Sequence, residues 1–212
     1  MTDCCNDKAC EIEALRSRQS GTLKIVLGIN AVMFGVELTA GIMSGSVSLL
    51  ADSLDMLGDA LVYGFSLYVV ARGARMKAQA ALLKGGIMAA FALFVLGQAV
   101  HRMLLPHIPV FETIGAIGAL ALAANGMCLL LLWRHRADDI NMRSVWLCSR
   151  NDIIANVSVL FAAVGVWLTG EGWPDLIVGL ALAVLFLRSA LFVLRAAGAE
   201  LRAADAGTSV HR

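Results

Sequence analysis

Three aspartates lie close together in a stretch of the chain that is otherwise apolar: Asp52, Asp55 and Asp59. Asp55 and Asp59 are four residues apart, a spacing that places them on one face of a helix, one turn from each other. An Asp at the centre of a bilayer costs about 2.5 to 3.5 kcal/mol, so three of them indicate a function or nearby partners. The same segment holds no basic residue that is placed to neutralise Asp55 and Asp59.

Asp52 precedes Asp55 by three residues and leans toward the same helix face, near the start of the segment. Because Asp is preferred in the first turn of a helix, we favour a capping or interfacial role for Asp52. A secondary contribution to the binding of an ion beside Asp55 and Asp59 is the alternative.

A second polar cluster contains Cys148, Asp152 and Asn156, and it also lies in an apolar stretch. Cys148 and Asp152 are four residues apart, so one helix face carries a soft thiolate and a hard carboxylate. Two such pairs, one from each segment, supply four ligands, the number that a tetrahedral Zn²⁺ site requires. Cys148 alone would be read as a small buried hydrophobic residue. Asn156 is a secondary candidate ligand.

Apolar stretches of about 20 residues, long enough for a helix to cross a bilayer, recur along the chain. Hydrophobic residues make up 59% of the sequence and charged residues only 16%, which favours an all-α, polytopic membrane protein over a soluble domain. We predict six transmembrane helices: Ile25–Met43, Leu49–Ala71, Ala78–Val100, Phe111–Trp133, Ser144–Leu168 and Pro174–Leu194. The first twenty residues are polar, so a cleavable signal peptide is not expected.

The basic residues predict the orientation of the chain, because Lys and Arg stay on the cytoplasmic side. They are concentrated before the first span and after the second, fourth and sixth, so both termini should be cytoplasmic. We expect a cytoplasmic tail at 1–21, a six-span domain at 22–197 and a short tail at 198–212. The spread of basic residues over short loops argues against binding of nucleic acid.

The first tail carries Cys4, Cys5 and Cys10. Five cysteines in all, an odd number, with three in a cytoplasmic tail, do not make a disulfide framework. The tail thiols are secondary candidate metal ligands that would capture a soft ion inside the cell, although a flexible tail must order itself to bind.

The segment Ser46 to Asp52, followed by Asp55 and Asp59 and then by Asp152 in the fifth span, resembles the cation diffusion facilitator family of divalent-metal transporters. In this family two residues on span two and two on span five, each pair four apart, form the transport site. The resemblance implies that Asp55, Asp59, Cys148 and Asp152 bind the transported ion.

The resemblance further implies a protein of the bacterial inner (cell) membrane that exports a divalent transition metal. It implies no cofactor beyond the transported ion, and it implies a homodimer embedded in lipid. Family members usually have His or Asp at the position of Cys148; a thiolate there favours Zn²⁺ or Cd²⁺. Members commonly continue into a cytoplasmic C-terminal domain. Here about eighteen residues follow Leu194, so we expect a short member without that domain.

The predicted site has its own electrostatic consequence. Four negative charges in one pocket of low dielectric are unfavourable, so the empty site should hold protons, and a metal ion must displace them. This predicts metal/proton antiport.

A membrane metal sensor or assembly subunit that does not transport is the alternative function. An intramembrane aspartyl protease is a remote one, because Gly58-Asp59 lacks the Gly-x-Gly-Asp motif of those enzymes; no enzyme activity is expected.

Overall fold

The computed structural model describes residues 3–69, 74–133 and 140–209, and these ranges contain helices and short connections. Side chains are described for 21–22, 24–61, 63–64, 79–131, 133, 152–199 and 201–202. The helices found there are α1 (Asp3–Ser44), α2 (Val47–Val69), α3 (Ala74–Leu104), α4 (Phe111–Trp133), α5 (Ile140–Thr169) and α6 (Trp173–Ser209). The predicted all-α class and the existence of six helices are therefore confirmed for the described part of the chain.

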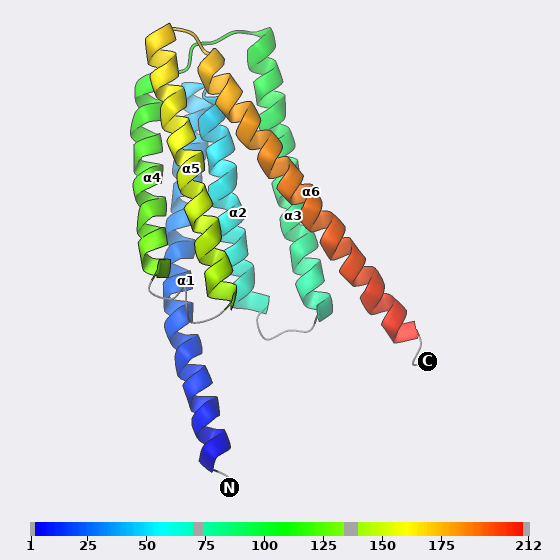
Figure 1. Cartoon of the computed structure of the whole chain (residues 1–212). Helices are drawn as coiled ribbons and strands as arrows, with labels where there is room; N and C mark the ends of the chain where they lie inside the picture. Colours follow the sequence, from blue (N-terminus) through cyan, green and yellow to red (C-terminus); the bar gives the residue numbers. More distant parts are fainter. Residues whose placement is uncertain (1–2, 70–73, 134–139, 210–212) are drawn as a thin grey trace.

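The helices run up and down, and the start of α1 and the end of α6 lie at the same end of the bundle (Figure 1). We call this the terminal end, and the opposite end, which holds the α1–α2, α3–α4 and α5–α6 connections, the loop end. The helices α1, α2, α4 and α5 pack together, whereas α6 packs chiefly along α3 and crosses the bundle obliquely.

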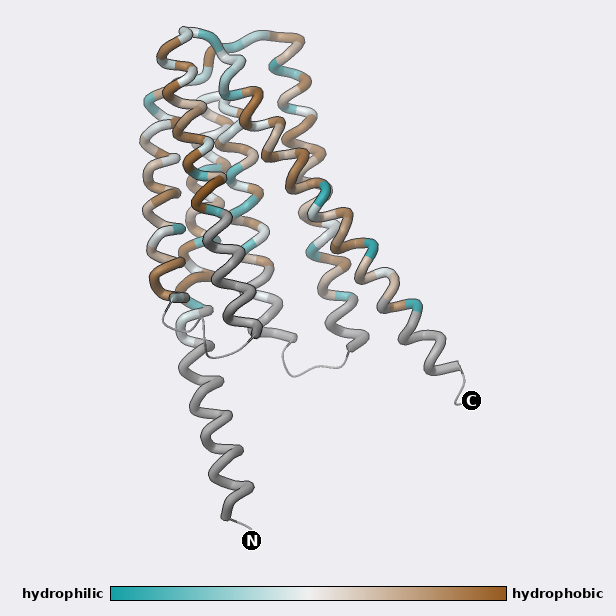
Figure 2. The backbone as a smooth tube through the Cα atoms, viewed as in Figure 1, coloured by the Kyte–Doolittle hydropathy of each residue, from teal (hydrophilic) through white to brown (hydrophobic). Residues whose placement is uncertain are grey.

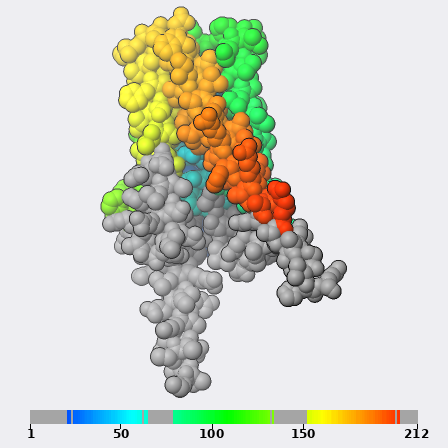
Figure 3. Space-filling view, turned by 45° about the vertical axis from the view of Figure 1, so that its right-hand side comes forward, coloured from blue at the N-terminus to red at the C-terminus, as the bar shows by residue number. Residues whose placement is uncertain are grey.

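Five of the helices in the described ranges are long and apolar enough to cross a membrane: α1, α3, α4, α5 and α6. Apolar residues run along α3, α5 and α6 in Figure 2. The helix α2 falls outside this set, since every membrane-length stretch of it includes Asp52, Asp55 and Asp59. It contacts α1, α3, α5 and α6, and on the face shown in Figure 3 it is visible as a narrow strip between α5 and α6. Of its three carboxylates, those of Asp52 and Asp55 are buried, and that of Asp59 is half-buried.

The boundaries of the predicted spans match the helices unevenly. The fourth span, Phe111–Trp133, coincides with α4 at both ends. By contrast, α1 begins at Asp3 and α6 continues to Ser209, well beyond the predicted spans. Apolar composition marks the part of a helix that enters lipid, but good helix formers such as Glu, Ala and Arg prolong the helix past that point.

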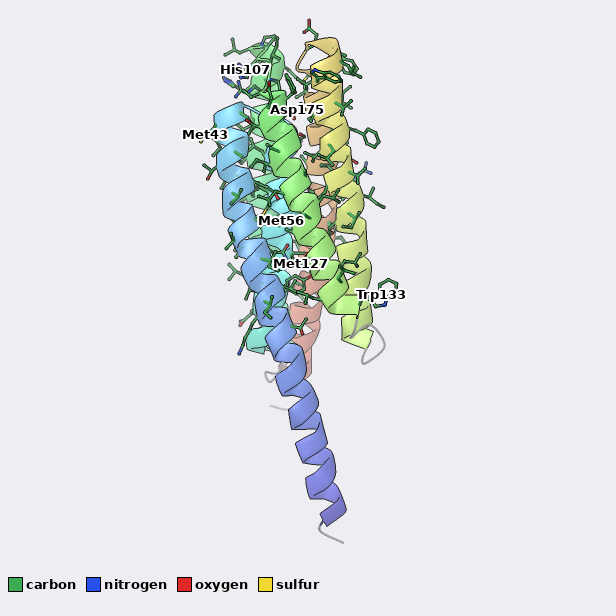
Figure 4. All side chains as sticks on the ribbon, turned by 90° about the vertical axis from the view of Figure 1, so that its left-hand side faces the viewer. Met43, Met56, His107, Met127, Trp133 and Asp175 are labelled. Carbon is green, nitrogen blue, oxygen red and sulfur yellow. The ribbon has the colours of Figure 1, made fainter. Side chains whose placement is uncertain are left out.

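The loop end is tied together by close contacts between α6 and the start of α2. Gly45 and Gly170 turn the chain there with φ of 71° and 66°, values that suit glycine. A Cβ atom at Gly179 of α6 would lie only 2.7 Å from the carbonyl carbon of Val47 and 2.8 Å from the nitrogen of Ser48, so the two backbones touch. Asp175 is labelled at this end in Figure 4.

Asp175, at the start of α6, also holds the start of α2 through hydrogen bonds. Its Oδ1 accepts from Ser46 Oγ at 2.6 Å and from Ser48 Oγ, and its Oδ2 accepts from the Val47 N–H at 2.7 Å. Ser46 Oγ in turn accepts from the Leu49 N–H at 3.1 Å, which makes Ser46 the N-cap of α2. The serines that begin the sequence motif thus stabilise the helix that carries the aspartates.

Candidate functional site

Three predicted ligands, Asp55 and Asp59 of α2 and Asp152 of α5, are brought together by the packing of these two helices. The carboxyl group of Asp152 interacts electrostatically with those of Asp55 and Asp59, and its Oδ2 is buried without a hydrogen-bond partner among the described residues. Met56, which follows Asp55, lies at about mid-height of the bundle in Figure 4. The three carboxyl groups therefore meet in the interior, far from both ends of the helices.

Cys148, the fourth predicted ligand, belongs to α5, one helical turn before Asp152, but its side chain lies outside the described residues. The tail cysteines, Cys4, Cys5 and Cys10, belong to α1, and their side chains are outside them too. Among the side chains that are described, no three of the His, Cys, Asp or Glu type are gathered tightly enough to hold a metal ion. Binding of an ion by Asp55, Asp59 and Asp152 would require the carboxylates to draw closer.

The exposure of the acids rises toward the terminal end. Asp52 is 0% exposed, Asp55 is 9% and Asp152 is 7% exposed, and Asp59 is half-buried. Asp52 is the nearest of these acids to the loop end, so the most buried acid lies on that side of the group.

Asp52 does not cap α2, so the capping or interfacial role favoured from the sequence is wrong. Both of its oxygens accept from Asn156 Nδ2 of α5, at 2.9 and 3.1 Å. Asn125 Nδ2 of α4 donates to Asn156 Oδ1 at 3.0 Å, which fixes the amide in place. The secondary candidates Asp52 and Asn156 are thus paired with each other, a contact between residues that are 104 positions apart.

Several neighbours of the three acids were not predicted as part of the site. Tyr63 donates to Asp59 Oδ2 at 3.1 Å, and Lys84 of α3 exerts an electrostatic effect on Asp59. Cys128 of α4 is a free, buried thiol within electrostatic range of Asp59 and Asp152, and Asn30 Nδ2 contacts its sulfur at 3.8 Å. Tyr63 shares a helix face with Asp59, four residues away, so its spacing was a usable signal.

Comparison with known proteins identifies the family. The model of the cation efflux transmembrane domain matches residues 23–202, most of the chain. The chain therefore belongs to the cation efflux family, a family of transport proteins, as the sequence motifs predicted. This membership argues against an intramembrane aspartyl protease.

Individual relatives carry names that concern metal transport. The chain is 28% identical over 195 residues to the zinc transporter ZitB of Yersinia pestis, covering 86% of this chain and 62% of the relative. It is 26% identical over 196 residues to the cadmium, cobalt and zinc/H(+)-K(+) antiporter of Bacillus subtilis, covering 82% and 61%. The metal cation efflux system protein CzcD of Cupriavidus metallidurans is 24% identical over 168 residues, covering 73% and 52%. The chain thus spans about six-tenths or less of the length of these relatives.

Proposed function

We propose that this protein is a transporter that exports a divalent transition-metal ion, with Zn²⁺ and Cd²⁺ favoured, through a site formed by Asp55, Asp59, Cys148 and Asp152. The observation that carries the proposal is that three acids from α2 and α5, two of them buried, interact electrostatically inside a membrane bundle. A cluster of acids in that setting is expensive, and binding of a cation offsets the cost. The names of the relatives, which mention zinc, cadmium and cobalt, agree with this choice of ion.

The proposal includes six membrane spans, namely the five apolar helices and α2 in addition. It also places both termini in the cytoplasm and the bundle in a bacterial inner membrane. The helix α2 crosses the bilayer in contact with its neighbours, which shields its aspartates from lipid. With the terminal end in the cytoplasm, the greater exposure of Asp59 gives cytoplasmic metal access to the site. Export then requires a second state that is open at the loop end. The homodimer stays a prediction, which cross-linking in membranes would check.

Proton antiport is part of the same proposal. The buried carboxyl groups of Asp55, Asp59 and Asp152 interact electrostatically, and because ionised carboxylates repel one another, the empty site is expected to hold protons. The metal binds the deprotonated forms and so releases protons on arrival. The Lys84 charge offsets part of the repulsion at Asp59, but one cation leaves a site with three carboxyl groups short of neutral.

The test uses proteoliposomes with Zn²⁺ outside and a pH-sensitive dye inside. We expect Zn²⁺ uptake accompanied by a change in luminal pH, and a response to an imposed proton gradient. The variants Asp59→Ala and Asp152→Ala should abolish uptake while the protein still folds and inserts. Normal uptake by either variant would locate the site elsewhere; uptake with no change in luminal pH would indicate a uniporter. A sensor or assembly subunit would show no uptake in the unmodified protein.

A further inference from the structure

Glu37 of α1 is a buried acid that neither the fold nor the transport site explains. It is 0% exposed, and neither of its carboxyl oxygens has a hydrogen-bond partner among the described residues. Buried polar groups in native proteins are almost always paired, and a carboxyl group is among the costliest to leave alone. An orphaned, fully buried carboxyl group therefore indicates a partner that binds only at some stage of the protein's work.

Among the acids of α2, Asp52 is the one that acts on Glu37, and Glu37 in turn acts on Asp55, last among the neighbours of that residue. The carboxyl groups of Asp52 and Glu37 interact electrostatically across the α1–α2 interface. Asp52 is itself held by Asn156, whose single Nδ2 group serves both oxygens. Each carboxylate oxygen has two lone-pair sites, so Asp52 keeps the capacity to bind a cation while the amide holds it in one orientation.

This pair lies one helical turn from the transport site, toward the loop end. Asp52 precedes Asp55 by three residues on α2, a rise of about 4.5 Å along the helix axis. Asn156 follows Asp152 by four residues on α5. Because α5 runs antiparallel to α2, Asn156 lies nearer the loop end than Asp152, as Asp52 lies nearer the loop end than Asp55. The polar residues of α2 and α5 thus form two successive levels, and Glu37 adds a carboxylate to the level nearer the loop end.

We propose that Glu37 and Asp52 form a second station for the transported divalent cation, between the transport site and the loop end of the bundle. The proposal rests on the proposed function, since it concerns the ion that the transport site delivers. Its ligands are oxygens alone, and a borderline ion such as Zn²⁺ binds these less tightly than a set that includes thiolate. A weaker station beside a tighter site suits release, because an ion that crosses must also be able to leave.

The two levels are too close to be filled together comfortably. Two divalent ions about one helical turn apart repel strongly in a medium of low dielectric. A single ion would therefore pass from Asp55, Asp59 and Asp152 to Glu37 and Asp52 rather than occupy both levels. Glu37 supplies the negative charge that keeps the ion stable after it leaves the transport site.

The first measurement compares Glu37→Gln with a matched control, Glu112→Gln, which removes one negative charge from an exposed position at the start of α4. In proteoliposomes, Zn²⁺ flux through Glu37→Gln should fall roughly tenfold or more, because the ion loses its partner at that depth. The Zn²⁺ affinity of the purified variant should stay within about threefold of the unmodified protein, since the transport site is intact. The control variant Glu112→Gln should keep both the Zn²⁺ flux and the Zn²⁺ affinity of the unmodified protein.

The second measurement detects the station directly by equilibrium dialysis with Zn²⁺. A variant that combines Asp55→Asn, Asp59→Asn, Asp152→Asn and Cys148→Ser lacks the predicted transport site but keeps Glu37 and Asp52. It should bind Zn²⁺ weakly, and adding Glu37→Gln should remove about one bound ion per chain, the capacity of one site. Adding Glu112→Gln should remove none.

Two results would overturn the inference: Zn²⁺ flux through Glu37→Gln equal to that of the unmodified protein, or no difference between Glu37→Gln and Glu112→Gln in dialysis. Both leave the proposed function intact, provided that the variant without the transport site is inactive. If that variant still carries Zn²⁺ at the normal rate, the proposed function itself fails. Misfolded Glu37→Gln would show as aggregation in size-exclusion chromatography, and Glu37→Asp, which keeps the charge, then serves in its place and should retain most of the flux.

Discussion

Replacing Asp175 by Ala should destabilise the protein without touching the transport site. Asp175 is 2% exposed and accepts hydrogen bonds from two hydroxyl groups and two backbone N–H groups at the start of α2. Ala removes the acceptor and leaves all of these donors in place. Because Asp175 stands on α6, the substitution also breaks the main polar link between α6 and α2.

The structure sets the size of the effect. Ser46 Oγ and Ser48 Oγ lie 3.2 Å apart and can bond each other, so the hydroxyl groups recover part of their loss. The N–H groups of Val47 and Ser48 are fixed in the first turn of α2 and cannot turn to another acceptor. Leaving a buried donor unsatisfied costs about 1 to 3 kcal/mol, so the two N–H groups together predict a loss of about 2 to 6 kcal/mol.

Thermal unfolding in detergent, followed by size-exclusion chromatography, measures the effect. Asp175→Ala should unfold at a clearly lower temperature than the unmodified protein, and Asp175→Asn should fall between them, because its amide group keeps one oxygen but faces the Val47 N–H with a donor. Glu171→Ala, which removes an exposed carboxylate from the neighbouring loop, is the control and should change little. Unfolding of Asp175→Ala at the temperature of the control would refute this account of the α2–α6 link.

Three further outcomes test the site and the tail. Cys148→Ser should lower transport of Cd²⁺ more than that of Zn²⁺, since sulfur favours the softer ion; an unchanged ratio in vesicles would remove Cys148 from the site. Zn²⁺ affinity measured by dialysis should fall as the pH drops from about 8 to about 6, because protons compete for the same donors; a flat profile would contradict antiport. Deletion of residues 1–10 should weaken the protection of cells at low metal and leave vesicle transport at saturating metal nearly normal; loss of the latter would make the tail structural.

Much of the fold and the centre of the site were predictable, because both follow from local spacing. A membrane helix needs a fixed apolar length, and α4 coincides with its predicted span at both ends. The four-residue spacing of Asp55 and Asp59 placed them on one face, and two polar faces in an apolar bundle have each other as natural partners. In the structure both acids interact electrostatically with Asp152, and binding of a metal ion by this group stays a prediction.

The rest depends on packing that local patterns do not encode. Asp52 was read as a cap from its place near a helix start, whereas its partner Asn156 comes from a distant helix. Only the three-dimensional arrangement shows that Glu37 is buried without a hydrogen-bond partner among the described residues and interacts electrostatically with Asp52. The electrostatic effect of Lys84 on Asp59 joins α3 to α2, and no spacing rule along the sequence links these two residues.

The contact of Gly179 with the backbone of α2 has a mechanical consequence. Two helices that touch backbone to backbone cannot slide closer there, so the contact acts as a pivot for any tilt of α2 relative to α6. Displacement grows with distance from a pivot: Asp52 lies four residues beyond Ser48, about 6 Å along the axis, and Asp59 lies eleven residues beyond it, about 17 Å. A tilt of about 10° would therefore move Asp52 by about 1 Å and Asp59 by about 3 Å. The ligand nearest the terminal end has the longest lever arm, so a small rotation loosens that side of the site and leaves the side near the loop end almost still.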